Sequence, residues 1–134
     1  MTQADTAPVR LIKANALSSQ TGQTSGIQRF EAISSRMAGA RGIWMGYSVL
    51  PPGEKTGAHH HGESETALYM LRGKGRFLVG ERLDQELVAE AGDFLYIPPH
   101  TVHVEENASD TEPAEMIVAR STQEAIVINL DEPR

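Results

Sequence analysis

The feature of the sequence that most limits its fold is a regular series of turn signals after residue 26. Gly and Pro clusters recur as "AGARG", "LPPGEKTG", "RGKG", "EAGD" and "IPPH". The runs between them are short and rich in β-branched, aromatic and other apolar residues. Such spacing is typical of an all-β sandwich or barrel. We expect strands at Ile27–Ile33, Gly42–Leu50, Thr66–Leu71, Arg76–Val79, Phe94–Ile97, Thr101–Glu105, Glu115–Ala119 and Ala125–Leu130.

The segment "ERLDQELVAEAG" is the best helix candidate, because Leu83, Leu87 and Val88 suit one helix face. It lies between two firm strands and ends at a Gly-Asp turn. We therefore predict a turn and a strand there.

In "GIWMGYSVL" both sets of alternating positions carry large apolar side chains. Met45 and Tyr47 lie in one set, and Trp44 and Leu50 in the other. A strand that is apolar on both faces lies between two layers, or between a barrel interior and a partner subunit. Both interpretations remain open from the sequence.

The length of 134 residues suits one domain. We divide it into an N-terminal arm over 1–26, a β-barrel over 27–130 and a frayed tail over 131–134. The chain has no cysteine, so any metal must bind through nitrogen and oxygen, and a reducing compartment is compatible.

The charge pattern excludes some partners. The net charge is −6 and the twelve Lys and Arg residues are scattered, so we expect no nucleic-acid partner. No apolar stretch is long enough to span a membrane. The first ten residues, "MTQADTAPVR", lack the apolar core of a signal peptide. We expect a soluble, cytoplasmic protein.

All five histidines gather in two separate segments that could meet at a metal. In "GAHHHGESET", an extended backbone directs His59 and His61 to one side and His60 to the other. Glu65 follows after a turn and is the nearest carboxylate that could return to the same ion. The second segment, "GDFLYIPPHTVHVEEN", contributes His103 at the start of another strand.

These segments resemble the two motifs of the cupin family. The first family motif runs Gly, five residues, His-x-His, three or four residues, Glu, six residues, Gly; here Gly53, "EKTGA", the histidine triplet, "GES", Glu65 and Gly73 follow it. The second runs Gly, five residues, Pro-x-Gly, two residues, His, three residues, Asn. Here it reads Gly92, "DFLYI", "PPH", "TV", His103, "VEE" and Asn107. The resemblance implies a single-domain double-stranded β-helix, the jelly-roll barrel of the cupins.

Two positions depart from the family pattern. Counting back from Gly73 by the family spacing reaches Thr66, not Glu65; a β-bulge would return Glu65 to the interior, and otherwise three histidines and water hold the ion. His100 stands where the family has its second-motif glycine. It either touches substrate at the barrel mouth or lies on a turn, and we favour the turn.

The metal site that we predict consists of His59, His61, Glu65 and His103, and the resemblance implies one divalent transition-metal ion. Imidazoles and one carboxylate suit Fe, Ni, Zn, Mn or Cu, without choosing among them. A six-coordinate ion would retain open positions for substrate or dioxygen.

Strand alternation suggests further residues for the cavity. Arg29 or Arg41 could hold an anionic substrate. If His103 faces inward, Glu105 should too, and as a candidate catalytic residue it could act as a general base whose pKa is raised by burial. The substrate-pocket candidates are Tyr47, Met45, Met70, Phe94 and His100.

Two classes of function fit these residues. The first is a metal-dependent enzyme acting on a small organic molecule, either by dioxygenase-type oxidation or by Lewis-acid isomerisation or cyclisation. The second is a non-catalytic module that binds a small ligand or a metal. An epimerase-like cupin fits less well, because it needs a His–Tyr pair and usually no metal. The resemblance also implies a homodimer, in which the arm and the tail "AIVINL" would cover sheet edges.

Overall fold

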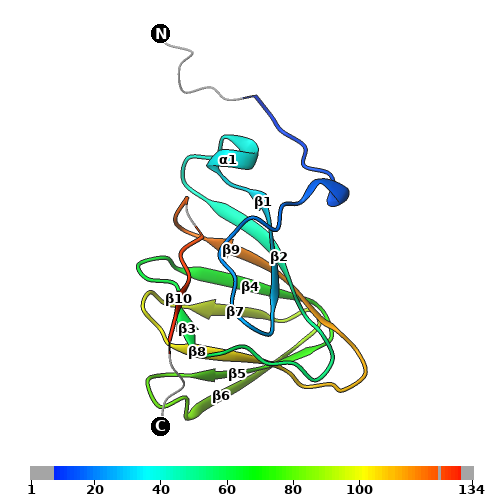
Figure 1. The fold of residues 1–134 in the computed structure, drawn as a ribbon, viewed down its shortest axis with the longest axis vertical. Helices are drawn as coiled ribbons and strands as arrows, with labels where there is room; N and C mark the ends of the chain where they lie inside the picture. Colours follow the sequence, from blue (N-terminus) through cyan, green and yellow to red (C-terminus); the bar gives the residue numbers. More distant parts are fainter. Residues whose placement is uncertain (1–7, 124, 131–134) are drawn as a thin grey trace.

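The computed structural model describes residues 8–123 and 125–130, and these form two antiparallel β-sheets that face each other (Figure 1). Each sheet has five strands. The first has the order β1-β2-β9-β4-β7, and the second has the order β10-β3-β8-β5-β6. Neighbouring strands in each sheet are mostly far apart in the sequence. This crossing pattern confirms the expected jelly-roll barrel.

The first sheet contains most of the long strands. They alternate between buried and exposed side chains, as a half-buried sheet requires. Strand β2 pairs with β9 along its whole length, from Trp44 opposite Arg120 to Leu50 opposite Ala114. The strands of this sheet are β1 (Gln28–Ile33), β2 (Trp44–Leu50), β9 (Ala114–Arg120), β4 (Thr66–Arg72) and β7 (Phe94–Ile97).

The second sheet carries the histidines. It is narrow at β3, which pairs with β8 only at His59 and His103 and with β10 over two residues. The segment "ERLDQELVAEAG" forms a turn and strand β6, as predicted, because it pairs in full register with β5. The strands are β10 (Ile128–Asn129), β3 (His59–His60), β8 (His103–Asn107), β5 (Lys74–Val79) and β6 (Gln85–Glu90).

In the described part of the chain, two short helices lie outside the sheets. The first is a 3-10 turn over Ala14–Ala16, and the second is α1 (Ser35–Ala38), which sequence patterns did not predict. The Ser34 side chain caps α1 by accepting from the Met37 backbone N–H, and Gly39 ends it in a left-handed conformation. Among the described residues, no helix is long and apolar enough to cross a membrane.

The space between the sheets has an apolar part and a polar part. The apolar part is a continuous core of the following buried side chains: Ile27, Trp44, Leu50, Leu68, Met70, Phe77, Ala89, Ile97, Ala114, Met116 and Val118. The polar part includes Thr66 and Arg120 at the ends of two inward rows and Ser48 within a third. These residues lie in one pocket with His103 and Glu105. The strand alternation that builds the core therefore also places polar groups in one interior pocket.

The described part of the N-terminal arm binds to the barrel within this chain. Ser18 and Glu31 exchange two backbone hydrogen bonds, and the Thr24 hydroxyl donates to Asn129 Oδ1 at 2.8 Å. In the segment expected as a last strand, only Ile128–Asn129 forms one, and it pairs with β3. The predicted frayed tail, 131–134, falls outside the described residues.

Candidate metal centre

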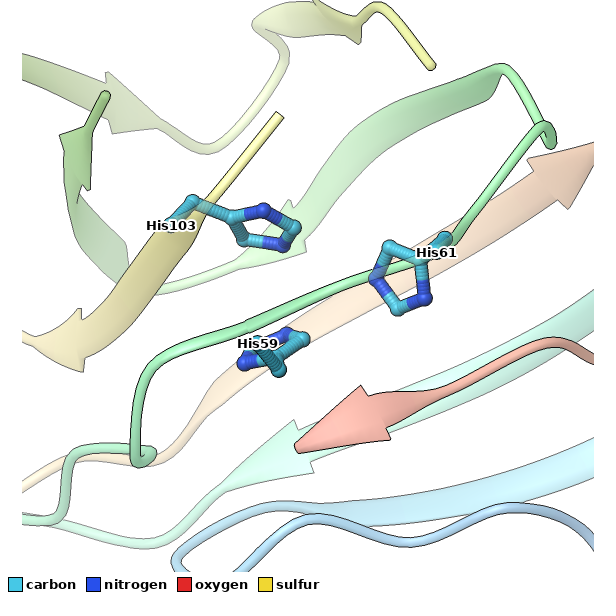
Figure 2. Close-up of side chains that lie close together, drawn as sticks. All are labelled: His59, His61 and His103. Atoms are coloured by element: carbon cyan, nitrogen blue, oxygen red, sulfur yellow. The ribbon is translucent and has the colours of Figure 1, made fainter. Parts of the chain in front are cut away.

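Three histidines from the two predicted segments meet inside the barrel. His59 begins β3, His61 follows directly after it, and His103 begins the neighbouring strand β8. The rings turn toward one shared space (Figure 2), with centroids 4.3 Å apart for His59 and His103 and 5.2 Å for each other pair. At most 4 % of any of the three residues is exposed to solvent.

The backbone fixes which nitrogen of each ring faces that space. The Nδ1 atom of His59 lies 2.9 Å from the Gly57 carbonyl oxygen, that of His61 2.8 Å from Ile126 O, and that of His103 2.9 Å from Thr101 O. A carbonyl oxygen can only accept, so each Nδ1 carries its proton and donates it. In the neutral rings each of the three Nε2 atoms therefore carries a lone pair that faces this space.

These lone pairs form a set suited to one cation. One ring nitrogen from each histidine lies within 4.8 Å of the other two. Among the described residues, His103 Nε2 is a buried atom without a hydrogen-bond partner. Ring nitrogens oriented by hydrogen bonds from the opposite nitrogen are the usual arrangement at histidine metal sites. The residues present thus fit a divalent transition-metal ion, as the sequence predicted.

The surroundings keep two of the rings neutral. Burial, together with the charge of Arg120, lowers the pKa of His61 to about 2. Burial lowers the pKa of His103 to about 4, although the negative charge of Glu105 opposes this. Neutral imidazole is the form that binds metal, so these two ligands need no deprotonation at neutral pH.

Glu105 lies beside the histidines, where strand alternation predicted it. Its Oε2 atom is 3.2 Å from His59 Nε2 and 3.7 Å from His103 Nε2. The expected raised pKa is wrong: burial raises it, but the neighbouring side chains of His59, His103 and Arg29 outweigh burial and hold the pKa below its usual value. Glu105 is therefore a carboxylate and not a protonated acid.

Two buried arginines complete the pocket. Arg29 Nη2 lies 3.2 Å from His59 Nε2, and Arg120 Nη2 lies 3.4 Å from His61 Nε2. Arg120 also packs over the Trp44 ring, 5.1 Å from its centroid, and its Nη1 is buried with no partner among the described residues. Burial and repulsion from Arg29 lower the Arg120 pKa to about 9, so it stays charged at neutral pH.

The pocket between these groups is small. Its volume is about 10 Å³ for the centres of water-sized molecules, which is room for roughly one water. Two guanidinium groups and one carboxylate give it a net positive charge before any metal binds. The lining residues are Arg29, Ser48, His61, Thr66, Leu68, Ile97, His103, Glu105, Val118 and Arg120.

The structure does not bring Glu65 to this site. Glu65 is exposed, and its Oε1 accepts a hydrogen bond from the Tyr96 hydroxyl at 3.1 Å. Thr66 points inward instead, with Leu68 and Met70. The irregularity in the β4–β9 pairing lies between Met70 and Arg72, at the far end of the strand, so it does not turn Glu65 inward. Counting back from Gly73 by the family spacing reaches Thr66, and Thr66 is the residue that points inward in this chain.

The predicted substrate-pocket residues lie elsewhere. Met45 and Tyr47 face outward, because the other alternating set of β2 contains Trp44 and faces the core; the Tyr47 hydroxyl donates to Glu115. Phe94 is 79 % exposed on the outer face of β7. Met70 is buried in the apolar core and does not line the pocket.

His100 lies on the turn, which was the favoured alternative. It is exposed and has a left-handed backbone with φ 58°, the conformation that the family's glycine adopts readily. Its ring lies 6.1 Å from that of His60, on the outer side of the strand. Of the two arginines considered from the sequence, Arg29 enters the site and Arg41 is exposed.

Sequence reasoning missed Arg120. A signal was present, because in "AEMIVAR" the apolar row Ala114, Met116 and Val118 continues to Arg120. An arginine at the end of a buried row is expected inside unless the strand bends away. Its closeness to His61 depends on tertiary pairing between β9 and β4, which the local pattern does not show.

A family model described as the cupin domain matches residues 46–120. The chain belongs to the cupin family. The matched region contains all three histidines, Glu105 and Arg120. Their arrangement inside the barrel is therefore part of a cupin domain and not of an appended segment.

Similar proteins support the same fold. An uncharacterised protein of Methanocaldococcus jannaschii is 37% identical over 60 residues, which cover 45% of this chain and 46% of that protein. Bacillus subtilis oxalate decarboxylase matches at TM-score 0.70 and 23% identity, over 81% of this chain and 28% of that one. An oxalate oxidase matches at TM-score 0.74 and 19% identity, over 100% of this chain and 74% of that one. The chain thus spans less than half of the curated relative and less than a third of the decarboxylase.

Proposed function

We propose that this cupin is a metal-dependent enzyme that acts on a small carboxylate anion. The observation that carries the proposal is the pairing of three inward Nε2 atoms with two buried guanidinium groups in one pocket. A divalent ion at the histidines would add positive charge beside Arg29 and Arg120. An anion that bridges the ion and the guanidinium groups would neutralise that charge.

Arg120 is the group best prepared to receive the anion. Its Nη1 has no partner among the described residues, and its Nε lies at 3.4 Å from Thr66 Oγ1, near the limit of a hydrogen bond. Arg29 is more fully occupied, because Nη1 donates to Thr24 Oγ1 at 2.8 Å. A buried unsatisfied donor costs free energy that a bound carboxylate would recover.

The likeness to known structures supports a small carboxylic acid as the substrate. The structural neighbours include Bacillus subtilis oxalate decarboxylase, with one structure concerned with its Mn(II) centres, and a recombinant oxalate oxidase in complex with glycolate. At 23% and 20% identity these likenesses establish the fold, and we use their ligands only to choose candidate compounds.

A divalent ion here supplies Lewis acidity and, if redox-active, electron transfer. The side chains have separate tasks. Arg120 and Arg29 orient the anion. The apolar side chains of Leu68, Ile97 and Val118 keep bulk water away, and the Glu105 carboxylate can accept a proton at Oε1. The tight pocket selects compounds with few non-hydrogen atoms.

The test uses protein stripped of metal and reloaded with Mn²⁺, Fe²⁺ or Zn²⁺. Glycolate, oxalate and other small mono- and dicarboxylates are compared with neutral diketones and catechols, following binding by calorimetry, oxygen uptake, and product by NMR. We expect metal-dependent binding and turnover of a carboxylate. Turnover of neutral compounds alone would contradict the proposal.

The second candidate is the non-catalytic ligand-binding module. The small volume of the pocket favours it, because the closed site leaves little room for a reacting complex. Carboxylate binding without oxygen uptake or product, with every metal, would support this alternative. A homodimer remains part of the proposal and is checked by light scattering.

A further inference from the structure

We propose that Glu105 is the carboxylate ligand of the metal in this chain, in place of the first-motif glutamate. The inference rests on the proposed function in one respect only: it needs the three histidines to hold an ion. It assigns to β8 a ligand that the family pattern places before β4.

The first argument is an unfavourable contact that a cation would relieve. The ring proton of neutral His59 lies on Nδ1 and is donated to Gly57 O, so His59 Nε2 carries a lone pair. Glu105 Oε2 is 3.2 Å away and also carries lone pairs. Two acceptors repel at this distance, and nearby positive charge relieves the repulsion: Arg29, 3.2 Å from His59 Nε2, supplies part of it, and an ion shared by His59 and Glu105 would supply the rest.

The other close neighbour of His59 Nε2 is a donor, which agrees with a lone pair on that atom. Arg29 Nη2 lies 3.2 Å from the same His59 Nε2 atom. Because a guanidinium group can only donate, an N–H at Nε2 would place two donors in contact. A metal ion shared by His59 and Glu105 satisfies both lone pairs without adding a donor there.

The second argument is distance. With bonds of ~2.1 Å to a common ion, neighbouring ligand atoms lie ~3.0 Å apart at octahedral angles and ~3.4 Å at tetrahedral angles. Glu105 Oε2 is 3.2 Å from His59 Nε2 and 3.7 Å from His103 Nε2. The carboxylate is therefore close to ligand spacing without a backbone movement, and His103 Nε2 has no other partner among the described residues.

The third argument is the position of each carboxylate on its strand. Glu105 is two residues after His103, so alternation gives the two side chains one face. Its backbone is fixed on both sides by Thr56: Thr56 N–H donates to Glu105 O at 2.9 Å, and Glu105 N–H donates to Thr56 Oγ1 at 3.0 Å. Glu65, by contrast, is exposed and bound to Tyr96.

The assignment has a consequence for the pocket. Glu105 is the only acid among its lining residues, and the place of the family's glutamate is taken by the neutral Thr66. Within the lining of this pocket, the side near Thr66 and Arg120 therefore contributes no carboxylate. A small anion could approach there without repulsion.

The experiment measures metal affinity, which does not depend on knowing the substrate. Metal-free protein and the variants Glu105→Gln, Glu65→Gln and Glu106→Gln are titrated with Zn²⁺ against a chromophoric chelator. Glu106 is the matched control, because it is next in the chain but bonds outward to Arg76. We expect Glu105→Gln to weaken Zn²⁺ binding at least about tenfold, with no change in the two controls.

A crystal structure of the Zn²⁺-loaded native protein decides the assignment even if Glu105→Gln does not fold. We expect a Glu105 oxygen at a bonding distance of ~2.0–2.2 Å from the ion. Wild-type affinity in Glu105→Gln, loss of affinity in Glu65→Gln, or an ion bonded to the histidines but not to Glu105 would overturn the assignment and leave the proposed function standing. Absence of Zn²⁺ binding by the native protein would overturn both.

Discussion

His59 and His103 are direct partners across the β3–β8 pair, and this is their strands' one register contact. Their rings lie 4.3 Å apart, although the residues are separated by the whole of β4, β5, β6 and β7. The site therefore depends on the closure of the second sheet. Local sequence positions both histidines, and the tertiary pairing brings them together.

Replacement of Arg120 should weaken anion binding more than metal binding. In Arg120→Gln the group that faces His61 loses its charge, so we expect carboxylate affinity of the metal-loaded protein to fall by about 1.5–3 kcal/mol, the usual value of a hydrogen bond to a charged group. Calorimetry with glycolate measures this. Arg41→Gln, on an exposed arginine outside the pocket, is the control, and an equal loss in both variants would contradict the role of Arg120.

Acid should destabilise the metal-free protein below about pH 6.5. The pKa of His61 is lowered to about 2 and that of His103 to about 4, so the unfolded chain binds protons at a higher pH than the folded one. Stability from these groups is complete above the unfolded value of about 6.5 and is lost as the pH falls toward the folded values. Urea unfolding from pH 7.5 to 4.5 measures the slope.

The two histidines should account for most of that slope. We expect a His61→Gln/His103→Gln variant to lose stability less steeply over the same pH range. A native protein whose unfolding free energy stays constant from pH 7 to 5 would contradict the lowered pKa values.

Gly46→Ala should destabilise the fold and disturb the pocket. A Cβ atom at this position would collide with the Phe30 carbonyl oxygen and the Trp44 ring, and Trp44 packs under Arg120. We expect a loss of about 1–3 kcal/mol in the free energy of unfolding. In the control Gly42→Ala the new methyl group meets no atom within 4 Å, and equal stability of both variants would refute the explanation.

Asn107 should prove structural, although it belongs to the family motif. Its amide nitrogen lies 3.0 Å from Leu50 O and 2.8 Å from Glu112 O, and its Oδ1 accepts from Ser109 N–H at 2.8 Å. Asn107→Ala leaves buried groups unpaired and should cost at least about 1–3 kcal/mol. Chemical denaturation checks this against exposed Asn15→Ala. A stable Asn107→Ala that loses Zn²⁺ affinity would show a direct role at the metal.

Much of the fold followed from turn spacing, and the histidines followed from the two-residue period of extended chain. His59, His61 and His103 were predicted because each lies at an inward position of a short strand next to a turn. The prediction that Glu65 faces the metal failed, because the choice between Glu65 and Thr66 depends on where β4 begins. Strand boundaries are the weakest part of a sequence-based prediction.

It was harder to predict which side chains of a strand point into the barrel than to predict where the strand lies in the sequence. Both sets of alternating residues in β2 are apolar, so the choice between Tyr47 and Trp44 needed the pairing with β9, which directs Trp44, Gly46, Ser48 and Leu50 inward. Arg120 was missed for a related reason. A buried arginine is uncommon, and only the assembled barrel shows the histidine and tryptophan that surround it.

The most direct test of the account is the metal content of the native protein beside that of His61→Ala/His103→Ala, after identical purification and loading with Mn²⁺ or Zn²⁺. Elemental analysis should find about one tightly held ion per native chain and essentially none in the folded double variant. Equal metal content in the two proteins would contradict a site built on these three histidines.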